Sequence, residues 1–456
     1  MKRSSNSKKS LEFCGIYSST FVPKHHKKAA SRTWAAGALL ALFTPFSYAA
    51  YQVDVNWDST TRNLPPEFFS INHFQMFDTT STWVSSWKNG IQFIAPGSLR
   101  FHNGEFMKKW YDPQTDDWRY ADIKKSFDMR LKGTEKVMLS INAWPASYAD
   151  ASGRLRSQDT LRFAALNNRL VSFLKTQYPS LSLIVEVPNE KEDLYANTTD
   201  GPDAYAESMG KIYRNMKQAN PDVPLAGPAF KFVPSTSNVS RFYGNPGIGL
   251  DYLTFHYYST GSATLSNQEV AQKFRSTAQK IATLAKSVQG KAGIMLTEYN
   301  INYAWQTPDL RMATHESAAF DLYFLIHLMP IDGLVSTFAW NDLNSNYGKL
   351  GSQGEFRPSA YLYHFLNGLF VGTVCNVSAI GLPDDVAIAA ILKGGKKRIA
   401  ASNVSNATQK IVLSPTGKSK AAYTGVAISA TGTREIEYTE GEEIALAPMS
   451  DILLWE

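Results

Sequence analysis

Two short apolar segments of the sequence each carry a glutamate at or near their ends. Residues 183–190 read LIVEVPNE and end on Glu190, and residues 294–300 read IMLTEYN and contain Glu298. Aliphatic runs of this length are typical of buried parallel strands, which would each deliver one carboxylate at the C-terminal end. Two carboxylates at a fixed separation can cleave a glycosidic bond, because one protonates the bridging oxygen while the other attacks the anomeric carbon or activates water.

This chemistry requires a fold that brings both glutamates to one opening. Eight strand-like segments occur between residues 63 and 370, at 68–73, 98–103, 137–144, 183–190, 224–228, 252–258, 293–300 and 334–341. Segments with helical spacing lie between them, for instance 160–178, 205–219, 267–289 and 315–329. Successive strands start roughly 28 to 46 residues apart, which leaves room for crossover helices. The sequence therefore predicts an α/β fold, a (β/α)8 TIM barrel over residues 63–370.

The composition changes after an apolar helix-like segment at 360–370. Short strand-like runs separated by Gly, Asn, Pro and Ser follow at 386–392, 398–402, 410–414, 426–430, 435–438 and 451–455. This spacing predicts a C-terminal β-sandwich over residues 371–456. Residues 50–62 alternate like a strand before the barrel begins, so we expect them to join the sandwich as an added N-terminal strand.

Residues 1–49 have the pattern of a signal peptide. Basic residues precede an apolar run at 35–46, and small residues follow it. The run has about 12 residues, fewer than the roughly 20 that span a bilayer, so no stable membrane span is expected. We predict cleavage near Ala50 and export to the periplasm or the extracellular space. Removal of this leader would leave Cys375 without Cys14, so cysteine usage does not reveal the redox compartment.

The net charge of +6 comes from the leader. Residues 1–49 hold eight Lys or Arg and one acid, so the rest of the chain has 38 basic and 39 acidic residues. A nearly neutral chain offers no electrostatic footprint for a phosphate backbone, and we expect no nucleic-acid partner.

Polar and aromatic residues gather where the predicted strands end. In a barrel of this type the C-terminal ends of the strands form the active site. The residues are Asn72, His73, Arg100, His102, Asn103, Asn142, Trp144, Asn189, Glu190, His256, Tyr257, Tyr258, Glu298, Tyr299, Asn300, Trp340 and Asn341. They predict one ring of functional side chains at the barrel mouth.

Several of these strand ends resemble the retaining glycoside hydrolases of clan A. The motifs LRFHN, VEVPNE, FHYY and LTEYN are most similar to glycoside hydrolase family 39, the family of β-xylosidases and α-L-iduronidases. The resemblance covers about residues 51–456 and includes a sandwich after the barrel. It implies a carbohydrate substrate, Glu190 as general acid/base and Glu298 as nucleophile.

The remaining site residues follow from the same ring. We expect Arg100 and Tyr258 to donate hydrogen bonds to Glu298, and Asn189 to bind the sugar 2-hydroxyl, a contact that tightens in the transition state. His102 and His256 would donate to sugar hydroxyls or orient the carboxylates.

Three further residues complete the predicted substrate-binding set. Trp144 and Trp340 are candidate stacking platforms for the sugar ring, and Asn142 is expected to bind substrate. Structural alternatives stay open: Arg100 could instead form a barrel ion pair with Glu186, and Trp340 could belong to the core. No metal site and no cofactor are expected, because the other histidines lack metal-ligand spacing.

Two other functions remain compatible with the sequence. A glucuronidase or a family 30-like hydrolase of the same clan would place cations in the cleft, and Lys108, Lys109 and Lys191 could supply them. A non-catalytic carbohydrate-binding barrel is the second alternative, although a binder does not need both an acid and a nucleophile.

Overall fold

A computed structural model describes residues 50–131, 134–196, 201–243, 248–415 and 420–456. The predicted leader lies outside these residues, so cleavage and export stay predictions. Within the described chain, none of the helices combines the length and the apolar character needed to cross a membrane.

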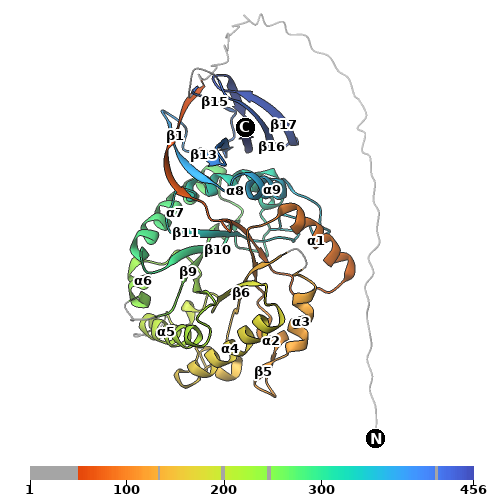
Figure 1. Cartoon of the computed structure of the whole chain (residues 1–456), viewed down its shortest axis with the longest axis vertical. Coiled ribbons are helices and arrows are strands. Elements are labelled where there is room, and N and C mark those ends of the chain that lie inside the picture. Colours follow the sequence, from red (N-terminus) through yellow and green to blue (C-terminus); the bar gives the residue numbers. More distant parts are fainter. Residues whose placement is uncertain (1–49, 132–133, 197–200, 244–247, 416–419) are drawn as a thin grey trace, which may run out of the picture. The chain divides into compact units, whose positions relative to one another are not determined.

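Eight parallel strands close into a barrel, which confirms the predicted fold (Figure 1). The strands in barrel order are β10 (Gly293–Asn302), β11 (Leu334–Ala339), β2 (Phe69–His73), β3 (Leu99–Phe101), β6 (Lys136–Ser140), β7 (Ser182–Glu186), β8 (Leu225–Phe230) and β9 (Tyr252–Thr260). A small apolar cluster from β6, β8, β10 and β11 fills the barrel interior, namely Met138, Ala226, Met295 and Phe338. This packed layer lies inside the barrel, beneath the C-terminal ends of the strands.

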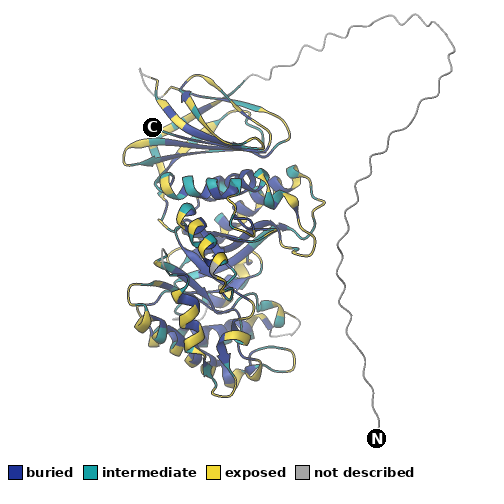
Figure 2. Ribbon diagram, turned by 90° about the vertical axis from the view of Figure 1, so that its right-hand side faces the viewer, coloured by how far each residue is buried: buried dark blue, intermediate teal, exposed yellow. Residues whose placement is uncertain are grey.

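Helices surround the barrel, and most of them bury one face and expose polar residues on the other, whereas the helix His315–Leu328 has no exposed residue (Figure 2). They are α1 (Ser81–Ile94), α2 (Phe106–Trp110), α3 (Tyr120–Asp128), α4 (Thr160–Gln177), α5 (Gly201–Ala219), α6 (Thr236–Tyr243), α7 (Asn267–Val288), α8 (His315–Leu328) and α9 (Pro358–Leu369). The start of α7 is a capping box, in which Ser266 and Glu269 satisfy each other's backbone N–H groups. A two-stranded hairpin, β4 (Tyr111–Asp112) and β5 (Asp117–Trp118), lies in the connection after β3.

The predicted sandwich is a second sheet with its own apolar core. Its described strands are β1 (Tyr51–Asn63), β12 (Thr373–Ala379), β13 (Val386–Lys393), β14 (Lys396–Asn403), β15 (Gln409–Leu413), β16 (Ala422–Ser429), β17 (Gly432–Thr439), β18 (Glu443–Leu446) and β19 (Ser450–Trp455). As predicted, the N-terminal strand joins it: β1 pairs antiparallel with β12 and parallel with β15, and Figure 1 shows it among the blue strands. The Ser402 hydroxyl donates to the Ala319 carbonyl of α8 at 2.8 Å, which attaches the sandwich to the barrel.

Candidate active site

The two predicted glutamates meet at the barrel mouth. Glu298 lies within β10, and Glu190 follows β7. One carboxylate oxygen of each, together with a ring nitrogen of His256, lie within 4.8 Å of one another. Carboxyl groups about 5 Å apart are the arrangement of glycosidases that retain the anomeric configuration, whereas inverting enzymes separate them by about 6.5 to 9.5 Å.

Glu190 reaches this position from a loop and not from a strand end. The sequence predicts a strand through residue 190, but β7 ends at Glu186 because Pro188 has no N–H to continue the ladder. The Glu190 backbone adopts a left-handed conformation with φ 49°, which costs a non-glycine residue about 1 kcal/mol. Its N–H donates to the carbonyl of Ala229 in β8 at 3.0 Å, so the neighbouring strand holds this strained backbone in place.

Two hydrogen-bond donors face Glu298. The Arg100 guanidinium donates to Oε1 at 2.8 Å, and the Tyr258 hydroxyl donates to Oε2 at 2.8 Å. Glu298 itself is only 6 % exposed. An ionised carboxylate in such a buried position needs charge-assisted donors, and these two stabilise its negative charge. The predicted contacts of Arg100 and Tyr258 are thus both present.

Arg100 also makes the alternative ion pair. It is fully buried, and its guanidinium bonds Glu186 as well as Glu298, with Nε 2.7 Å from Oε2 of Glu186. The remaining N–H groups donate to Asn72, Ser140 and Asn189 at 2.6 to 3.1 Å. One cation therefore compensates two carboxylates, and it does so from beneath the cavity and not from its wall. Asn189, which Arg100 orients, does line the cavity.

His256 connects the two acids. Its Nδ1 lies 2.7 Å from Oε1 of Glu190, and its Nε2 lies 3.6 Å from Oε1 of Glu298. Burial opposes protonation of this ring, but the charges of Glu298 and Glu190 outweigh it and raise the pKa of His256 above its ordinary value. The ring is fully buried, so it orients carboxylates and does not face the cavity.

The protonation of Glu190 follows from this contact. Burial favours the neutral acid, but the hydrogen bond from His256 and the charge of its ring outweigh burial and lower the pKa of Glu190. A neighbouring carboxylate alone would raise the pKa of Glu190, but in this arrangement the pKa is lowered instead. The physical reason is that an imidazole stands between the two carboxylates and supplies positive charge to both.

His102 lies on the opposite side of the site and is neutral. Burial, and then the positive charges of Arg100 and His256, hold the pKa of His102 well below its ordinary value. Its Nδ1 lies 3.3 Å from the Ser140 hydroxyl, and its side chain lines the cavity. A neutral imidazole of this kind can donate to or accept from a sugar hydroxyl.

The cavity above the two glutamates has a volume of about 610 Å³. Its lining is rich in aromatic side chains and comes from the C-terminal parts of seven of the eight barrel strands or from the loops after them: Phe74, His102, Gly104, Asn189, Glu190, Lys231, Phe232, Tyr258, Glu298, Tyr303, Trp305, Trp340, Asn341, Asn344 and Tyr347. The Trp340 ring packs edge-to-face against Phe74 and His102, with centroids 5.3 and 5.8 Å apart. Trp340 is thus both part of the packing and a wall of the cavity.

Four predicted substrate-binding residues do not line this cavity. Arg100 and His256 are the two buried residues described above, and Trp144 and Asn142 are the other two. Trp144 is buried, its indole N–H donates to the Gly153 carbonyl at 3.1 Å, and its ring packs edge-to-face on Phe163. It belongs to a second cavity of about 640 Å³ between the loops after β3, β6 and β7. Asn142 is buried, and its carbonyl accepts the Asn189 N–H at 3.2 Å. The predicted strand at 137–144 ends at Ser140, so residues beyond it turn away from the ring.

Several cavity residues were not predicted from the sequence. They follow the ends of β8, β10 or β11 by one to eight residues: Lys231, Phe232, Tyr303, Trp305 and Tyr347. Tyr303 and Trp305 closely follow the predicted strand at 293–300. The aromatic residues after Asn300 could therefore have been predicted to line the site. Phe232 carries no comparable signal.

Glu190, His256 and Glu298 have the donor types of a metal site, but their surroundings oppose a divalent cation. The Arg100 guanidinium bonds Glu298 at 2.8 Å and would repel a second positive charge. The expected absence of a metal stays a prediction.

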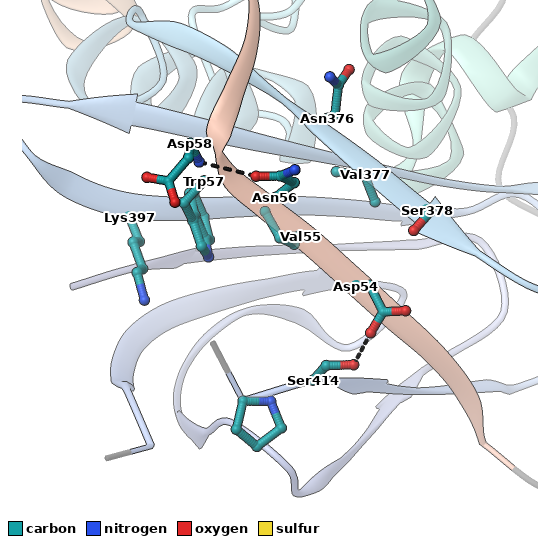
Figure 3. A pocket seen from close by; sticks show the side chains of 11 residues that line it. Asp54, Val55, Asn56, Trp57, Asp58, Asn376, Val377, Ser378, Lys397 and Ser414 are labelled. Carbon is teal, nitrogen blue, oxygen red and sulfur yellow. Dashed lines mark hydrogen bonds between the residues drawn. The ribbon is translucent and has the colours of Figure 1, made fainter. Parts of the chain in front are cut away.

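A separate groove of about 680 Å³ lies on the sandwich (Figure 3). Strands β1, β12 and β14 and the end of β15 supply its lining. The polar groups drawn there bond one another: Ser414 donates to Asp54, the side-chain Oδ1 of Asn56 accepts from the Asp58 N–H at 3.2 Å, and Lys397 lies over the Trp57 ring. None of the residues lining this groove comes from the barrel, so it does not take part in the chemistry of Glu190 and Glu298.

Comparisons with known proteins identify the fold. Neither the protein-family models nor the curated protein sequences match this chain. Among solved structures, a monomeric β-xylosidase from Caulobacter crescentus has 15 % identity and a TM-score of 0.63, with 89 % of this chain and 99 % of that chain covered. A glycoside hydrolase family 39 enzyme from Xanthomonas axonopodis pv. citri has 13 % identity and a TM-score of 0.62, covering 91 % and 99 %. A family 30 endoxylanase from Clostridium papyrosolvens has 17 % identity and a TM-score of 0.58, covering 89 % and 99 %. The chain therefore shares the barrel-and-sandwich fold of these enzymes.

Proposed function

We propose that this protein is a retaining glycoside hydrolase that cleaves O-glycosidic bonds of an oligosaccharide or polysaccharide by double displacement. The observation that carries the proposal is the meeting of Glu190 and Glu298 within 4.8 Å at one cavity, each with a different set of donors. The shared fold with xylosidases and xylanases supports it. The predicted leader supports action outside the cytoplasm, in the periplasm or beyond.

In the first step a Glu298 oxygen attacks the anomeric carbon. The glycosidic C–O bond breaks, its electron pair passes to the departing oxygen, and that oxygen takes a proton from Glu190. The products are an alcohol and a glycosyl ester of Glu298. Arg100 and Tyr258 hold the attacking carboxylate in place.

In the second step water attacks the anomeric carbon and loses a proton to the Glu190 carboxylate. The ester C–O bond breaks, and its electron pair returns to Glu298. Two displacements at one carbon restore the original anomeric configuration. Asn189, held by Arg100 at 2.6 Å, is positioned to bond the sugar 2-hydroxyl during both displacements.

The proton for the first step belongs to the Glu190–His256 pair. With the imidazolium form, Glu190 is ionised; transfer of the proton across the 2.7 Å hydrogen bond gives the carboxylic acid and a neutral imidazole. When substrate displaces water from the cavity, the pair favours the form in which Glu190 and His256 are both neutral. Glu190 is then the acid, and His256 is the residue that supplies and positions its proton.

The mutational test compares three glutamates. Glu190→Gln and Glu298→Gln should abolish hydrolysis of unactivated glycosides, and azide should restore turnover in Glu298→Ala by entering the space of the missing carboxylate. Glu105→Gln, which alters an acid outside the cavity, is the control and should keep full activity. Activity retained in both the Glu190→Gln and the Glu298→Gln variants would refute the proposal, as would inversion at the anomeric carbon in the first product observed by NMR.

A second candidate is a hydrolase of acidic sugars, such as a glucuronidase. The observation that favours it is the second cavity, which is lined by the cations Lys108, Arg119 and Lys191 next to the Glu190 loop. Chromogenic xylosides, glucosides and glucuronides separate the two candidates, because a site built for a uronic acid should cleave the glucuronide best.

A further inference from the structure

Three exposed aromatic side chains gather at the rim of the active-site cavity. Phe232, Tyr303 and Trp305 are 56 %, 57 % and 69 % exposed, and all three line the cavity. Large aromatic side chains are usually buried, and a cluster of exposed ones marks a binding surface. Packing of the fold does not account for their exposure.

Phe232 lies on the side of the acid. The chain just before it is joined to the Glu190 loop at several points. The Glu190 N–H donates to the Ala229 carbonyl at 3.0 Å, and the Lys231 N–H donates to Oε1 of Glu192 at 2.6 Å. The Lys231 ammonium also pairs with Asp193 at 2.9 Å. Phe232 is therefore fixed relative to Glu190 by backbone and side-chain bonds.

Tyr303 and Trp305 lie on the side of the nucleophile. They follow β10, which carries Glu298. The Tyr303 ring packs edge-to-face on Tyr258, the residue that donates to Glu298, with centroids 6.4 Å apart. The Tyr347 hydroxyl donates to the Tyr303 carbonyl at 3.1 Å and holds this rim in place.

We propose that Phe232 is the stacking platform of a leaving-group subsite that binds a second sugar ring. The inference rests on the proposed function, in which Glu190 protonates the glycosidic oxygen. The ring that departs with that oxygen must lie on the side of Glu190, where Phe232 presents an exposed face. The apolar C–H face of a pyranose stacks on an aromatic ring, whereas its hydroxyls remain hydrated. The natural substrate is accordingly a glycan with a sugar at the leaving-group position.

The test compares two substrates that share the cleaved sugar, chosen as the one that the wild-type protein releases from chromogenic glycosides. One is the disaccharide, and the other is the glycosyl fluoride, whose leaving group is too small to stack. Phe232→Ala should lower kcat/KM for the disaccharide about tenfold, which corresponds to about 1.4 kcal/mol of lost stacking energy. Turnover of the fluoride should change less than about twofold. Phe232→Tyr and Phe232→Trp should restore disaccharide cleavage.

Two matched variants separate stacking from general damage. Phe232→Leu keeps an apolar side chain without ring faces, so it should behave like Phe232→Ala. Trp305→Ala removes another exposed ring, from the other rim, and should not lower the disaccharide-to-fluoride ratio. An equal loss on both substrates in Phe232→Ala, or a ratio that falls only in Trp305→Ala, would overturn the assignment. If the wild-type protein cleaves neither substrate, the proposed hydrolase function is refuted, and the subsite proposal that depends on it is refuted as well.

The partitioning of the glycosyl ester between water and an added sugar gives an independent test of the stacking role of Phe232. A sugar acceptor enters from the leaving-group side, so Phe232→Ala should lower the fraction of transfer to an added sugar relative to transfer to water. An unchanged fraction would contradict a stacking role.

Discussion

The Nδ1 atom of His256 lies 2.7 Å from Oε1 of Glu190, while the other ring nitrogen lies 3.6 Å from Oε1 of Glu298. One buried imidazole thus contacts both acids of the proposed mechanism. Because of this contact, the protonation of Glu190 depends on the protonation of His256, and the pH dependence of catalysis reflects both residues.

The first prediction concerns His256→Asn. The pKa of His256 is raised above its ordinary value, so the pair keeps a proton to higher pH than a lone glutamate would. Without the imidazole, the acid form of Glu190 should be lost at lower pH. The alkaline limb of kcat/KM for an alkyl glycoside should therefore move to lower pH. The glycosyl fluoride, which needs no acid, is the control. An alkaline limb that stays in place would contradict the shared proton.

The second prediction concerns the buried ion pair. Arg100→Met leaves the Glu186 carboxylate buried without its cation and should cost about 3 to 5 kcal/mol of unfolding free energy in urea titrations. In the double variant Arg100→Met/Glu186→Leu part of this stability should return, because Glu186 no longer leaves an unpaired charge in the barrel, although Glu298 still lacks its cation. Activity should stay lost, since Glu298 still lacks its donor. Recovery of activity in the double variant would show that Arg100 serves the fold alone.

The third prediction isolates the neutral donor to Glu298. Tyr258→Phe removes the 2.8 Å hydrogen bond to Oε2 and should lower kcat/KM about 10- to 100-fold, the factor for a hydrogen bond to a charged group. Tyr347→Phe is the matched control, because Tyr347 lines the same cavity but donates to a backbone carbonyl. Equal losses in both variants would argue against a special role for Tyr258.

The fourth prediction is a stability effect far from the carboxylates. Burial, and then the charge of Arg275, lower the pKa of His327 to about 4, against about 6.5 in an unfolded chain. The unfolded chain therefore binds a proton that the folded chain does not, and stability falls as the pH drops from about 6.5 to about 4. The loss amounts to at most about 3 kcal/mol.

His327→Phe should remove this part of the acid sensitivity. His73 and His102, whose pKa values burial also lowers, remain in the variant and keep their own contributions. The measurement is the urea midpoint at several pH values. Parallel pH profiles for the variant and the wild-type protein would contradict the prediction.

The architecture can be predicted from local sequence patterns. All eight barrel strands, the sandwich and the added N-terminal strand follow from local hydrophobic patterns. The spacing of apolar residues along a strand or helix indicates which of its faces is buried. The two glutamates are also recognisable locally, since both follow aliphatic runs. Two sandwich strands, β12 and β18, are not predicted from the sequence, and most residues of both are partly or fully exposed.

Only the tertiary structure decided how the site works. The sequence left Arg100 with two alternative partners, and the structure gives it both. It placed Trp144 in the ring, whereas the chain turns after Ser140 and directs that residue to another cavity. It could not show that His256 stands between the acids or that Phe232 flanks Glu190. These relationships depend on distances between segments far apart in the chain, and no local pattern encodes such distances until the barrel has closed.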